Sequence, residues 1–298
     1  MNLMGRVPFI GRVLFLVITM PHRILEKERL NSVTHRVVFE APDVALNAKA
    51  GQFVVIRIDE KGERIPLTIN DSDRKQGTIT IIFQGVGRTT CRLISLKKGD
   101  SVLDILGPLG KATDFEKAGK VVFIAGGVGI AEAMPVARYA RECGNTVTAI
   151  IGARTKELLI LEDRMKGVSD RLFVTTDDGS RGAKGVVTVP LKELLDKESF
   201  DLAYCVGPDI MMKFVCGLTR QYDLKTLVSL DANMVDATCM CATCRVKVGG
   251  EIRFTCVDGP EFDGHLIDWD EFLKRQKRFA EEEARAMEYH GHKCRMTK

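Results

Sequence analysis

The chain has 298 residues, of which 45% are hydrophobic, enough for two or three globular domains with substantial cores. Its 44 lysine and arginine residues nearly balance 40 aspartate and glutamate residues, so the net charge is +4. No Lys/Arg-rich run with interleaved aromatic residues is present, which argues against nucleic acid as a partner.

Residues 1–20 are predicted to be an extension ahead of the fold. Val13–Met20 is apolar and has basic residues before and after it, as the central region of a signal peptide does. Arg12 interrupts the stretch, no small-x-small cleavage site follows, and it is too short to span a bilayer. A non-native or misassigned start ahead of Met20 is therefore favoured over a buried strand or a membrane anchor, and no membrane association is expected.

Residues 21–115 predict an antiparallel β-barrel. Four short segments rich in Val, Ile and Phe are bounded by Gly, Pro, Asp or Lys: HRVVFEAP, GQFVVIRI, GTITIIFQ and SVLDILGP. Several short strands with almost no helical period are typical of such a barrel.

Residues 116–225 change to an α/β pattern. KVVFIAGG is an apolar strand, and a helical pattern follows it over residues 130–141. Three later strand candidates, TVTAIIGA, RLFVTTDDG and LAYCVGP, alternate with segments of helical character such as VPLKELLDKE. This alternation predicts a Rossmann-like domain with a parallel, doubly wound sheet.

Residues 226–298 form a third part, a small cysteine-rich module with a helical tail. The tail sequence DEFLKRQKRFAEEEARAMEYH predicts one exposed or partner-facing helix. The nine cysteines of the chain are unevenly spread, unlike the distributed pairs of a secreted disulfide scaffold, so we expect a cytoplasmic protein.

A glycine-rich turn indicates a dinucleotide site in the α/β part. In IAGGVGIAEAMP, Gly126, Gly127 and Gly129 connect a strand to a helix, where unpaired N–H groups favour a pyrophosphate. TTDDGS and CVGPDIMM follow later strands and would meet at the same edge of the sheet. Asp177 and Asp178 are candidate ribose or carboxamide partners, although Asp-Gly is also ordinary turn chemistry.

The end of the strand candidate LAYCVGP contains two candidate residues for the nicotinamide side of that site. Cys205 and Gly207 could sit beside the nicotinamide ring. The alternative for Cys205 is a small buried core residue.

A second anion cradle is predicted in the barrel. RIPLTIND places Arg64 and Thr68 near a strand end, and GVGRTT supplies glycines and hydroxyls ahead of a short helix. An ordinary threonine N-cap would explain the second segment equally well. Two such cradles in one chain fit two nucleotide cofactors.

The cysteine module has metal-site spacing. Cys241 and Cys244 form a CxxC turn, and VKVGGEIRF predicts a hairpin that returns Cys256 to it. Structural zinc fits this spacing, but an iron–sulfur cluster would also give the two nucleotides an electron partner. The residues alone leave the fourth ligand open between Cys239, which is close to Cys241, and Asp236, whose oxygen would be an unusual ligand.

Eight motifs in order between residues 64 and 265 resemble the ferredoxin–NADP reductase superfamily. They are RIPLTI, GVGRTT, LGPLGK, GGVGIAEA, TTDDGSRGAKG, VGPDIMM and the cysteine segment MVDATCMCATCRVKV with CVDGPEFDGH. The pattern is most similar to the electron-transfer subunits of dihydroorotate dehydrogenase and of NADH-dependent reduced ferredoxin:NADP oxidoreductase. The likeness covers about residues 21–272.

The resemblance implies FAD in the barrel, NAD(H) in the α/β domain and a [2Fe–2S] cluster in the C-terminal module. It places FAD contacts at Arg64, Pro66, Leu67, Thr68, Gly85, Val86, Gly87, Thr89 and Thr90. It places NAD contacts at Gly126, Gly127, Val128, Gly129, Asp177, Asp178, Gly179 and Gly207, with Cys205 on the nicotinamide side. The closer relative carries Asp at the first cluster position, so Asp236, Cys241, Cys244 and Cys256 become the expected ligands. Cys239 departs from the pattern, which has Gly there.

The resemblance also implies a function. The chain would pass electrons between NAD(H), FAD and the cluster, as one subunit of an electron-bifurcating complex. Its partner would be a larger flavoprotein subunit with FAD and [4Fe–4S] clusters that reacts with NADP and ferredoxin. NAD is favoured over NADP, although Arg154 and Lys156 could supply a 2′-phosphate site.

Overall fold

A computed structural model describes residues 21–115 and 117–289. The predicted extension at residues 1–20 lies outside these ranges. Among the helices of the described ranges, none has the length and hydrophobicity needed to cross a membrane.

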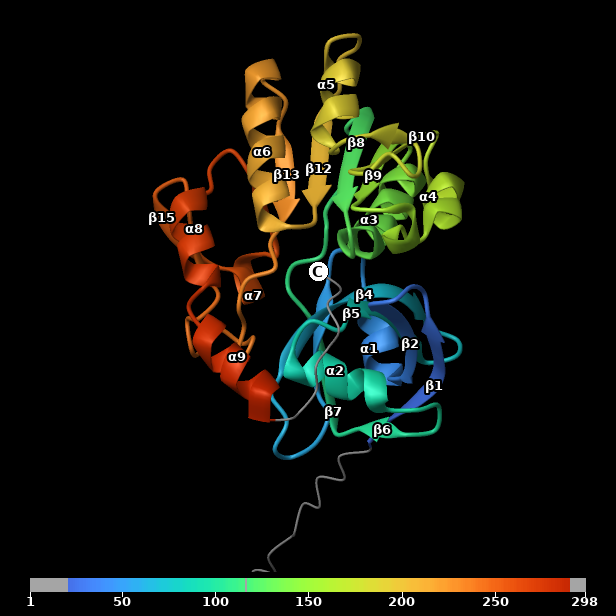
Figure 1. The fold of residues 1–298 in the computed structure, drawn as a ribbon, viewed down its shortest axis with the longest axis vertical. Helices are drawn as coiled ribbons and strands as arrows, with labels where there is room; N and C mark the ends of the chain where they lie inside the picture. Colours follow the sequence, from blue (N-terminus) through green and yellow to red (C-terminus); the bar gives the residue numbers. More distant parts are fainter. Residues whose placement is uncertain (1–20, 116, 290–298) are drawn as a thin grey trace, which may run out of the picture.

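The first domain is a seven-stranded antiparallel sheet with the order β6-β1-β2-β5-β4-β3-β7. Its strands are β1 (His22–Arg29), β2 (Thr34–Glu40), β3 (Phe53–Arg57), β4 (Ile65–Asp73), β5 (Thr78–Gln84), β6 (Ser101–Val102) and β7 (Asp104–Leu109). The two edge strands, β6 and β7, are consecutive in the chain, so the sheet curls into a nearly closed barrel (Figure 1). This confirms the predicted barrel, whose interior is packed with aliphatic and aromatic side chains.

Two short helices accompany the barrel, α1 (Pro42–Asn47) and α2 (Arg88–Ser95). Lys27 of β1 holds the end of α2, because its ammonium group donates to the carbonyl groups of Leu93, Ile94 and Leu96. A cation is favourable there, since the last carbonyls of a helix lack partners and carry its negative dipole end. The start of α2 is thereby held in place at the predicted cradle.

The second domain is a sheet with the order β11-β10-β9-β8-β12-β13-β16, parallel except for β16. Its strands are β8 (Lys120–Gly126), β9 (Thr146–Ala153), β10 (Arg171–Thr176), β11 (Ala183–Lys184), β12 (Leu202–Val206), β13 (Thr226–Ser229) and β16 (Glu261–Asp263). The helices are α3 (Gly129–Glu142), α4 (Glu162–Val168), α5 (Thr188–Leu195) and α6 (Asp209–Thr219), with 3₁₀ turns at Lys156–Leu158 and Arg220–Tyr222. The pairs α3/α4 and α5/α6 pack into two separate cores, so the predicted doubly wound arrangement is confirmed.

The sheet extends past residue 225, where the sequence suggested that the α/β domain ends. β13 pairs in parallel with β12, and β16, more than thirty residues later in the chain, pairs with the free side of β13. Strand pairing between such distant segments leaves no local signal in the sequence. The cysteine module is therefore inserted between two strands of the second sheet.

The C-terminal part contains the predicted hairpin, β14 (Arg245–Val248) and β15 (Glu251–Phe254), followed by α7 (Thr255–Asp258). The tail, expected as one helix, forms two: α8 (Trp269–Gln276) and α9 (Ala280–Tyr289). Trp269 and Phe272 anchor α8 in the core next to α6, and α9 runs down beside α2 of the barrel (Figure 1). The break between the helices lets the tail contact both domains.

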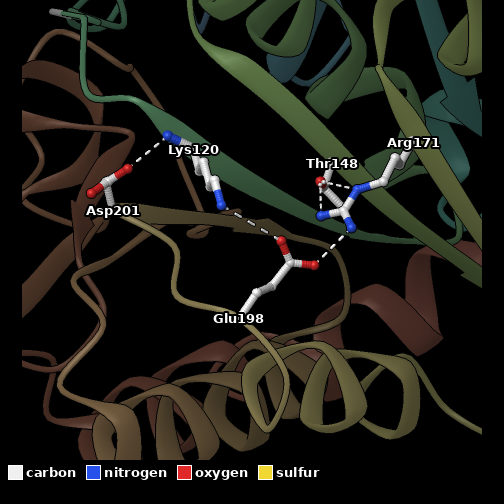
Figure 2. A network of polar contacts seen from close by, with 5 residues as sticks. All are labelled: Lys120, Thr148, Arg171, Glu198 and Asp201. Atoms are coloured by element: carbon white, nitrogen blue, oxygen red, sulfur yellow. Dashed lines mark hydrogen bonds and ion pairs between the residues drawn. The ribbon is translucent and has the colours of Figure 1, made fainter.

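A polar network joins the amino ends of the second sheet (Figure 2). Glu198, ahead of β12, lies 2.7 Å from an Arg171 nitrogen and 3.9 Å from the Lys120 ammonium group. Arg171 also donates to the Thr148 hydroxyl, and the Lys120 amide donates to Asp201 over 2.7 Å. These contacts connect β8, β9, β10 and β12 at the edge opposite the predicted nucleotide site, which leaves the carboxyl edge free for ligands.

The partly buried carboxylate of Glu261 forms hydrogen bonds that connect all three parts of the chain. Glu261 of β16 accepts hydrogen bonds from the Tyr204 hydroxyl of β12, over 2.8 Å, and from the Thr113 hydroxyl, just after the barrel. Gly51 makes room for this contact, because an added Cβ would lie 2.1 Å from the Thr113 hydroxyl. The φ angle of Gly51, +80°, also belongs to the left-handed region that favours glycine.

Gly129 lets the first turn of α3 pack against the end of β12. A Cβ added to Gly129 would lie 2.6 Å from the Val206 carbonyl oxygen. Because that atom belongs to the backbone, it cannot rotate away.

Replacing Gly129 with alanine should therefore destabilise the second domain. We expect the free energy of unfolding to fall by about 1–3 kcal/mol, the usual cost of overpacking. Gly167→Ala is the matched control, because its added Cβ meets nothing within 4 Å and alanine favours the helix. Equal urea midpoints for the two variants would contradict this packing argument.

Candidate functional site

A cavity of about 1050 Å³ lies at the carboxyl edge of the second sheet. The β8–α3 turn contributes Gly126, Gly127 and Val128 to its lining, and Asp177 and Gly207 come from the turns after β10 and β12. A Cβ on Gly127 would meet nothing within 4 Å, so the turn is open to the cavity. An open turn ahead of a helix start suits a pyrophosphate, so the cavity has the form that a dinucleotide would need.

Four predicted residues do not line this cavity. Gly129 is a packing residue, and Asp178 accepts hydrogen bonds from the amide and hydroxyl of Ser180 within its own turn, next to Gly179. Cys205 is fully buried in β12 beside Cys216, and the cavity lining begins one residue later, at Val206. The structure thus places Cys205 in the core, the alternative that its residue type suggested.

A second cavity, of about 860 Å³, lies between the barrel, the loop after β13 and α9. Its lining includes the predicted barrel residues Arg64, Pro66, Leu67, Thr68, Val86, Gly87, Thr89 and Thr90, while Gly85 lines the first cavity. From α9 and the residue before it, Phe279, Glu283 and Ala286 complete the wall. The tail helix therefore covers a cavity that the barrel alone would leave open.

The threonines of GVGRTT already have partners. The Thr90 hydroxyl accepts hydrogen bonds from the Val86 and Gly87 amides and donates to the Gly87 carbonyl, so it shapes the turn. The Thr89 hydroxyl donates to Glu63 over 2.9 Å. A Cβ on Gly87 would meet nothing within 4 Å, so the turn itself is the open part of the cradle.

The two cavities share a wall. Six residues line both: Gln84, Val86, Val128, Glu132, Ser229 and Asp231. The barrel and α3 are held together here, because the Asn70 amide donates to the Ala131 carbonyl over 2.6 Å and Arg138 pairs with Asp71 at 2.9 Å. Two ligands in these cavities would therefore lie side by side.

Sequence reasoning missed three acidic residues that line the sheet-edge cavity. Glu132 lies within an otherwise apolar helix start, Asp231 follows the apolar end of β13, and Asp209 opens α6. The sequence did contain a signal for these residues, because each is an acid that follows the carboxyl end of a strand by a few residues. What the sequence did not show is that the three strands bring them to one place.

Desolvation raises the pKa of each of these carboxyl groups. The pKa of Glu132 rises to about 7 through desolvation and the negative charge of Asp231, and the Thr68 hydroxyl opposes this by donating a hydrogen bond. The pKa of Asp231 rises to about 6 through desolvation and the charge of Asp209. For Asp209 the pKa is also raised by desolvation, against a hydrogen bond from Gln276.

The cysteine module brings its candidate ligands into one loop. The sulfur atoms of Cys244 and Cys256 are 3.3 Å apart and buried, and Cys241 is exposed at the start of the CxxC turn. Two ligands on one tetrahedral metal at about 2.3 Å per bond would be about 3.8 Å apart, so this pair suits one iron. Within the described ranges no three His, Cys, Asp or Glu side chains are grouped around one point as for a single metal ion. A [2Fe–2S] cluster instead takes its ligands as two pairs.

Both candidates for the fourth ligand lie in this loop. The Asp236 carboxylate accepts hydrogen bonds from the Thr238 and Cys241 amides, each over 2.8 Å, which holds it beside Cys241. Cys239 is half-buried and has a φ of +72°, in the region that favours glycine. Glycine is the residue that the resemblance led us to expect at this position.

Helix α8 connects the cysteine loop to the dinucleotide cavity. Arg275 donates to the Thr243 and Arg245 carbonyl groups over 3.0 and 3.2 Å. The next residue, Gln276, donates to the Asp209 carboxylate over 3.0 Å. One turn of helix thus contacts both sites.

Two sequence families match the chain. Residues 123–217 match the oxidoreductase NAD-binding domain, and residues 231–268 match the iron–sulfur cluster binding domain of dihydroorotate dehydrogenase B. A homologue of the dihydroorotate dehydrogenase B (NAD⁺) electron transfer subunit from Thermotoga maritima is 46% identical over 262 residues, 88% of this chain and 93% of that protein. The corresponding electron transfer subunit of Desulforamulus reducens is 33% identical over 248 residues, 80% of this chain and 93% of that protein.

Solved structures agree with these matches. A chain from the structure of NADH-dependent reduced ferredoxin-NADP oxidoreductase, studied for flavin-based electron bifurcation, is 44% identical with a TM-score of 0.87. The match covers 92% of this chain and 99% of that chain. Phthalate dioxygenase reductase, at 17% identity and a TM-score of 0.58, shares the fold.

The free energy of unfolding of the cofactor-free chain should fall as the pH rises from about 4.5 to about 7. The folded pKa of Glu132 exceeds its ordinary value, so the folded chain keeps a proton that the unfolded chain releases in this window. Its stabilising effect is complete below the unfolded pKa and is lost as the pH passes the folded pKa. Urea titrations at several pH values give the slope of the unfolding free energy against pH, which measures the protons released on unfolding. Glu132→Gln should reduce this release by up to one proton, and an unchanged slope would contradict the assignment.

Replacing Arg275 with glutamine should loosen the CxxC turn. The two lost hydrogen bonds from a charged donor correspond to about 3 kcal/mol, hence on the order of a hundredfold faster exchange of amide hydrogens over residues 241–246. Arg278→Gln is the control, because Arg278 is exposed and lies over the Phe279 ring. Hydrogen exchange followed by mass spectrometry compares the two, and equal rates would show that Arg275 does not brace the loop.

Proposed function

We propose a function from the premise that this chain belongs to the family of dihydroorotate dehydrogenase B electron-transfer subunits and their homologues. It is the electron-transfer subunit of a flavin-based electron-bifurcating NADH-dependent ferredoxin:NADP oxidoreductase. The 44% identity to a chain of such an enzyme, over nearly the whole of both chains, supports this assignment. It makes the chain an NAD(H)-dependent flavin and iron–sulfur oxidoreductase subunit.

The single observation that carries this function is the wall shared by the two cavities. When bound, FAD exchanges a hydride with NAD(H) and single electrons with the [2Fe–2S] cluster. The chain's own task is to hold two ligands against each other and to exclude water between them. Val86 and Val128 supply apolar surface to that wall from the barrel side and the α3 side.

In this proposal the barrel cavity holds FAD and the sheet-edge cavity holds NAD(H). Arg64, Pro66, Leu67 and Thr68 line the flavin side, and the Gly85–Thr90 turn would lie against the pyrophosphate. Gly126, Gly127, Val128, Asp177 and Gly207 would hold NAD(H). Arg154 shares that cavity with the carboxylates Glu157 and Asp177, which disfavour the 2′-phosphate of NADP and support NAD.

Asp236, Cys241, Cys244 and Cys256 are the proposed cluster ligands. Cys244 and Cys256 would bind one iron, and Cys241 with Asp236 the other. The hydrogen bond between the Asp236 carboxylate and the Cys241 amide supports this second pair, because it holds the two residues together. A carboxylate in place of a thiolate changes the charge and hence the reduction potential of the site.

A larger partner subunit completes the enzyme. The relatives are electron-transfer subunits of heteromeric enzymes, which supports a partner of this kind. We propose that the partner carries FAD and [4Fe–4S] clusters and reacts with NADP and ferredoxin. The uneven spread of the nine cysteines supports a reducing, cytoplasmic location.

A dihydroorotate dehydrogenase-type electron carrier is the second candidate, favoured by the names of several relatives. The subunit that co-purifies with the chain distinguishes the two, since that candidate requires a flavin barrel enzyme as partner. A zinc-stapled module without catalysis, the third alternative from the residues alone, is set aside because the segment belongs to an iron–sulfur domain family.

Iron, acid-labile sulfide and flavin content, with an EPR spectrum of the reduced chain, test the proposal. We expect two irons, two sulfides and one FAD per chain. In the chain loaded with cluster and FAD, Asp236→Ala should shift the cluster's spectrum and potential, because it removes a ligand. Cys239→Ser should leave both unchanged. The reverse outcome would make Cys239 the fourth ligand, and a colourless, zinc-containing protein would refute the function itself.

A further inference from the structure

Gln276 is the point where the tail helix α8 enters the wall of the dinucleotide cavity. Its side-chain nitrogen donates to the Asp209 carboxylate over 3.0 Å and to the Asp231 carbonyl, and its side-chain oxygen accepts from the Asn233 amide over 3.3 Å. Gln276, Asp209 and Asp231 all line the cavity. Because a reversed amide would place its oxygen against two acceptors, these contacts fix the orientation of the Gln276 side chain.

This corner is the end of the cavity where its ligand would meet the ligand of the barrel cavity. The glycine turn after β8 lies in the middle of the sheet, with β9 and β10 on one side of it and β12 and β13 on the other. Arg154 follows β9, whereas Asp209 and Asp231 follow β12 and β13. Ser229 and Asp231 also line the barrel cavity. An NAD(H) molecule with its pyrophosphate at the glycine turn would therefore place its nicotinamide on the β12–β13 side.

One carboxylate oxygen of Asp209 is left for a ligand on this side. Its Oδ2 atom accepts from Gln276, whereas its Oδ1 atom has no hydrogen-bond partner within residues 21–115 and 117–289. Oδ1 is not one of the buried unpaired atoms of these ranges, so it remains accessible at the cavity wall. Desolvation raises the pKa of Asp209, and the hydrogen bond from Gln276 opposes this by favouring the ionised form. An ionised carboxylate accepts hydrogen bonds and donates none, so the wall presents an aligned acceptor.

We propose that Asp209, held in place by Gln276, accepts a hydrogen bond from the nicotinamide carboxamide and makes the site selective for an amide at that position. The inference rests on the proposed function, because it takes NAD(H) as the ligand of this cavity. The NH₂ group of a carboxamide can donate to Asp209, whereas a nicotinic acid ring would bring a second carboxylate against it. Like charges repel strongly where water is scarce, so the site selects NAD(H) over its deamidated form of nearly the same size.

The charges around Asp209 favour the same selection. Among the described residues that line the cavity, five are acids and Arg154 is the one cation, which follows β9 on the far side of β8. The start of α6 acts in the opposite direction, because unpaired amides at a helix N-terminus favour an anion. Asp209 is itself the acid in the first turn of α6, so a carboxylate on the ligand would compete with a negative charge already there.

Isothermal titration calorimetry of the full chain, loaded with FAD and cluster, tests the proposal with four ligands. They are NAD⁺, nicotinic acid adenine dinucleotide, ADP-ribose, which lacks the pyridine ring, and the acetylpyridine analogue of NAD⁺, which keeps the carbonyl and lacks the NH₂ group. We expect the nicotinic acid form to bind at least about a hundredfold more weakly than NAD⁺, and the acetylpyridine form about tenfold more weakly. ADP-ribose reports on the rest of the site.

Asp209→Asn should reverse the preference. Gln276 donates toward this position, so the asparagine oxygen should turn to Gln276 and its NH₂ group should face the ligand. The variant should then bind the nicotinic acid form at least as tightly as NAD⁺, with the affinity for ADP-ribose unchanged. Asp163→Asn is the matched control, because Asp163 is an exposed aspartate in the first turn of α4. It should keep the wild-type ratios.

Gln276→Met tests the positioning role, because methionine has a similar length and donates no hydrogen bond. With Asp209 released, the ratio between the affinities for NAD⁺ and the nicotinic acid form should fall about tenfold, again with the affinity for ADP-ribose unchanged. Gln221→Met, in the exposed turn after α6, should keep the ratio. An equal loss of affinity for all four ligands in Gln276→Met would show a structural role alone and contradict the positioning role.

The outcomes separate this inference from the function beneath it. Wild-type chain without flavin or cluster, or without affinity for either NAD⁺ or ADP-ribose, would refute the function. A loaded chain that binds the nicotinic acid form as tightly as NAD⁺ would overturn the role of Asp209 alone and would show that the α6 N-terminus decides. If Asp209→Asn fails to fold, the wild-type ligand series and Gln276→Met decide.

Discussion

The carboxylate of Glu261 is the contact on which the arrangement of this protein depends. It accepts hydrogen bonds from Thr113, at the end of the barrel, and from Tyr204, in the middle of the second sheet, while its own strand closes that sheet. Three modules thereby meet at one polar point inside a largely apolar interface. Both functional cavities lie between modules, so their shape is a property of this junction and not of any one domain.

The junction concentrates acids where two nucleotides are expected to meet. Keeping a carboxyl group in a poorly solvated wall opposes folding, and the raised pKa of Glu132 expresses that cost. Water-poor surroundings are also what a hydride transfer site requires, because they exclude competing reactions.

The tail has a larger part in the architecture than its charged sequence suggests. Arg275 braces the CxxC turn, Gln276 contacts Asp209 in the dinucleotide cavity, and α9 covers the flavin cavity beside α2. A change at the cluster loop can therefore reach both cavities through a single short helix. The break after Gln276 lets the tail reach both cavities, because one continuous helix would not turn toward the flavin cavity and cover it.

The sequence by itself determined the local structures: the β-rich first domain, the alternating second domain, the hairpin between the cysteines and the two glycine-rich turns. These follow from residue spacing, since strand and helix periods and glycine conformations depend on neighbours in the chain. Only the tertiary structure decided that β13 and β16 extend the second sheet, that Cys205 is buried while Val206 lines the cavity, and that Glu132 and Asp231 lie in the wall shared by both cavities. Each of these depends on contacts between segments tens of residues apart, whose pairing is set by the packing of the whole chain and leaves no periodic trace.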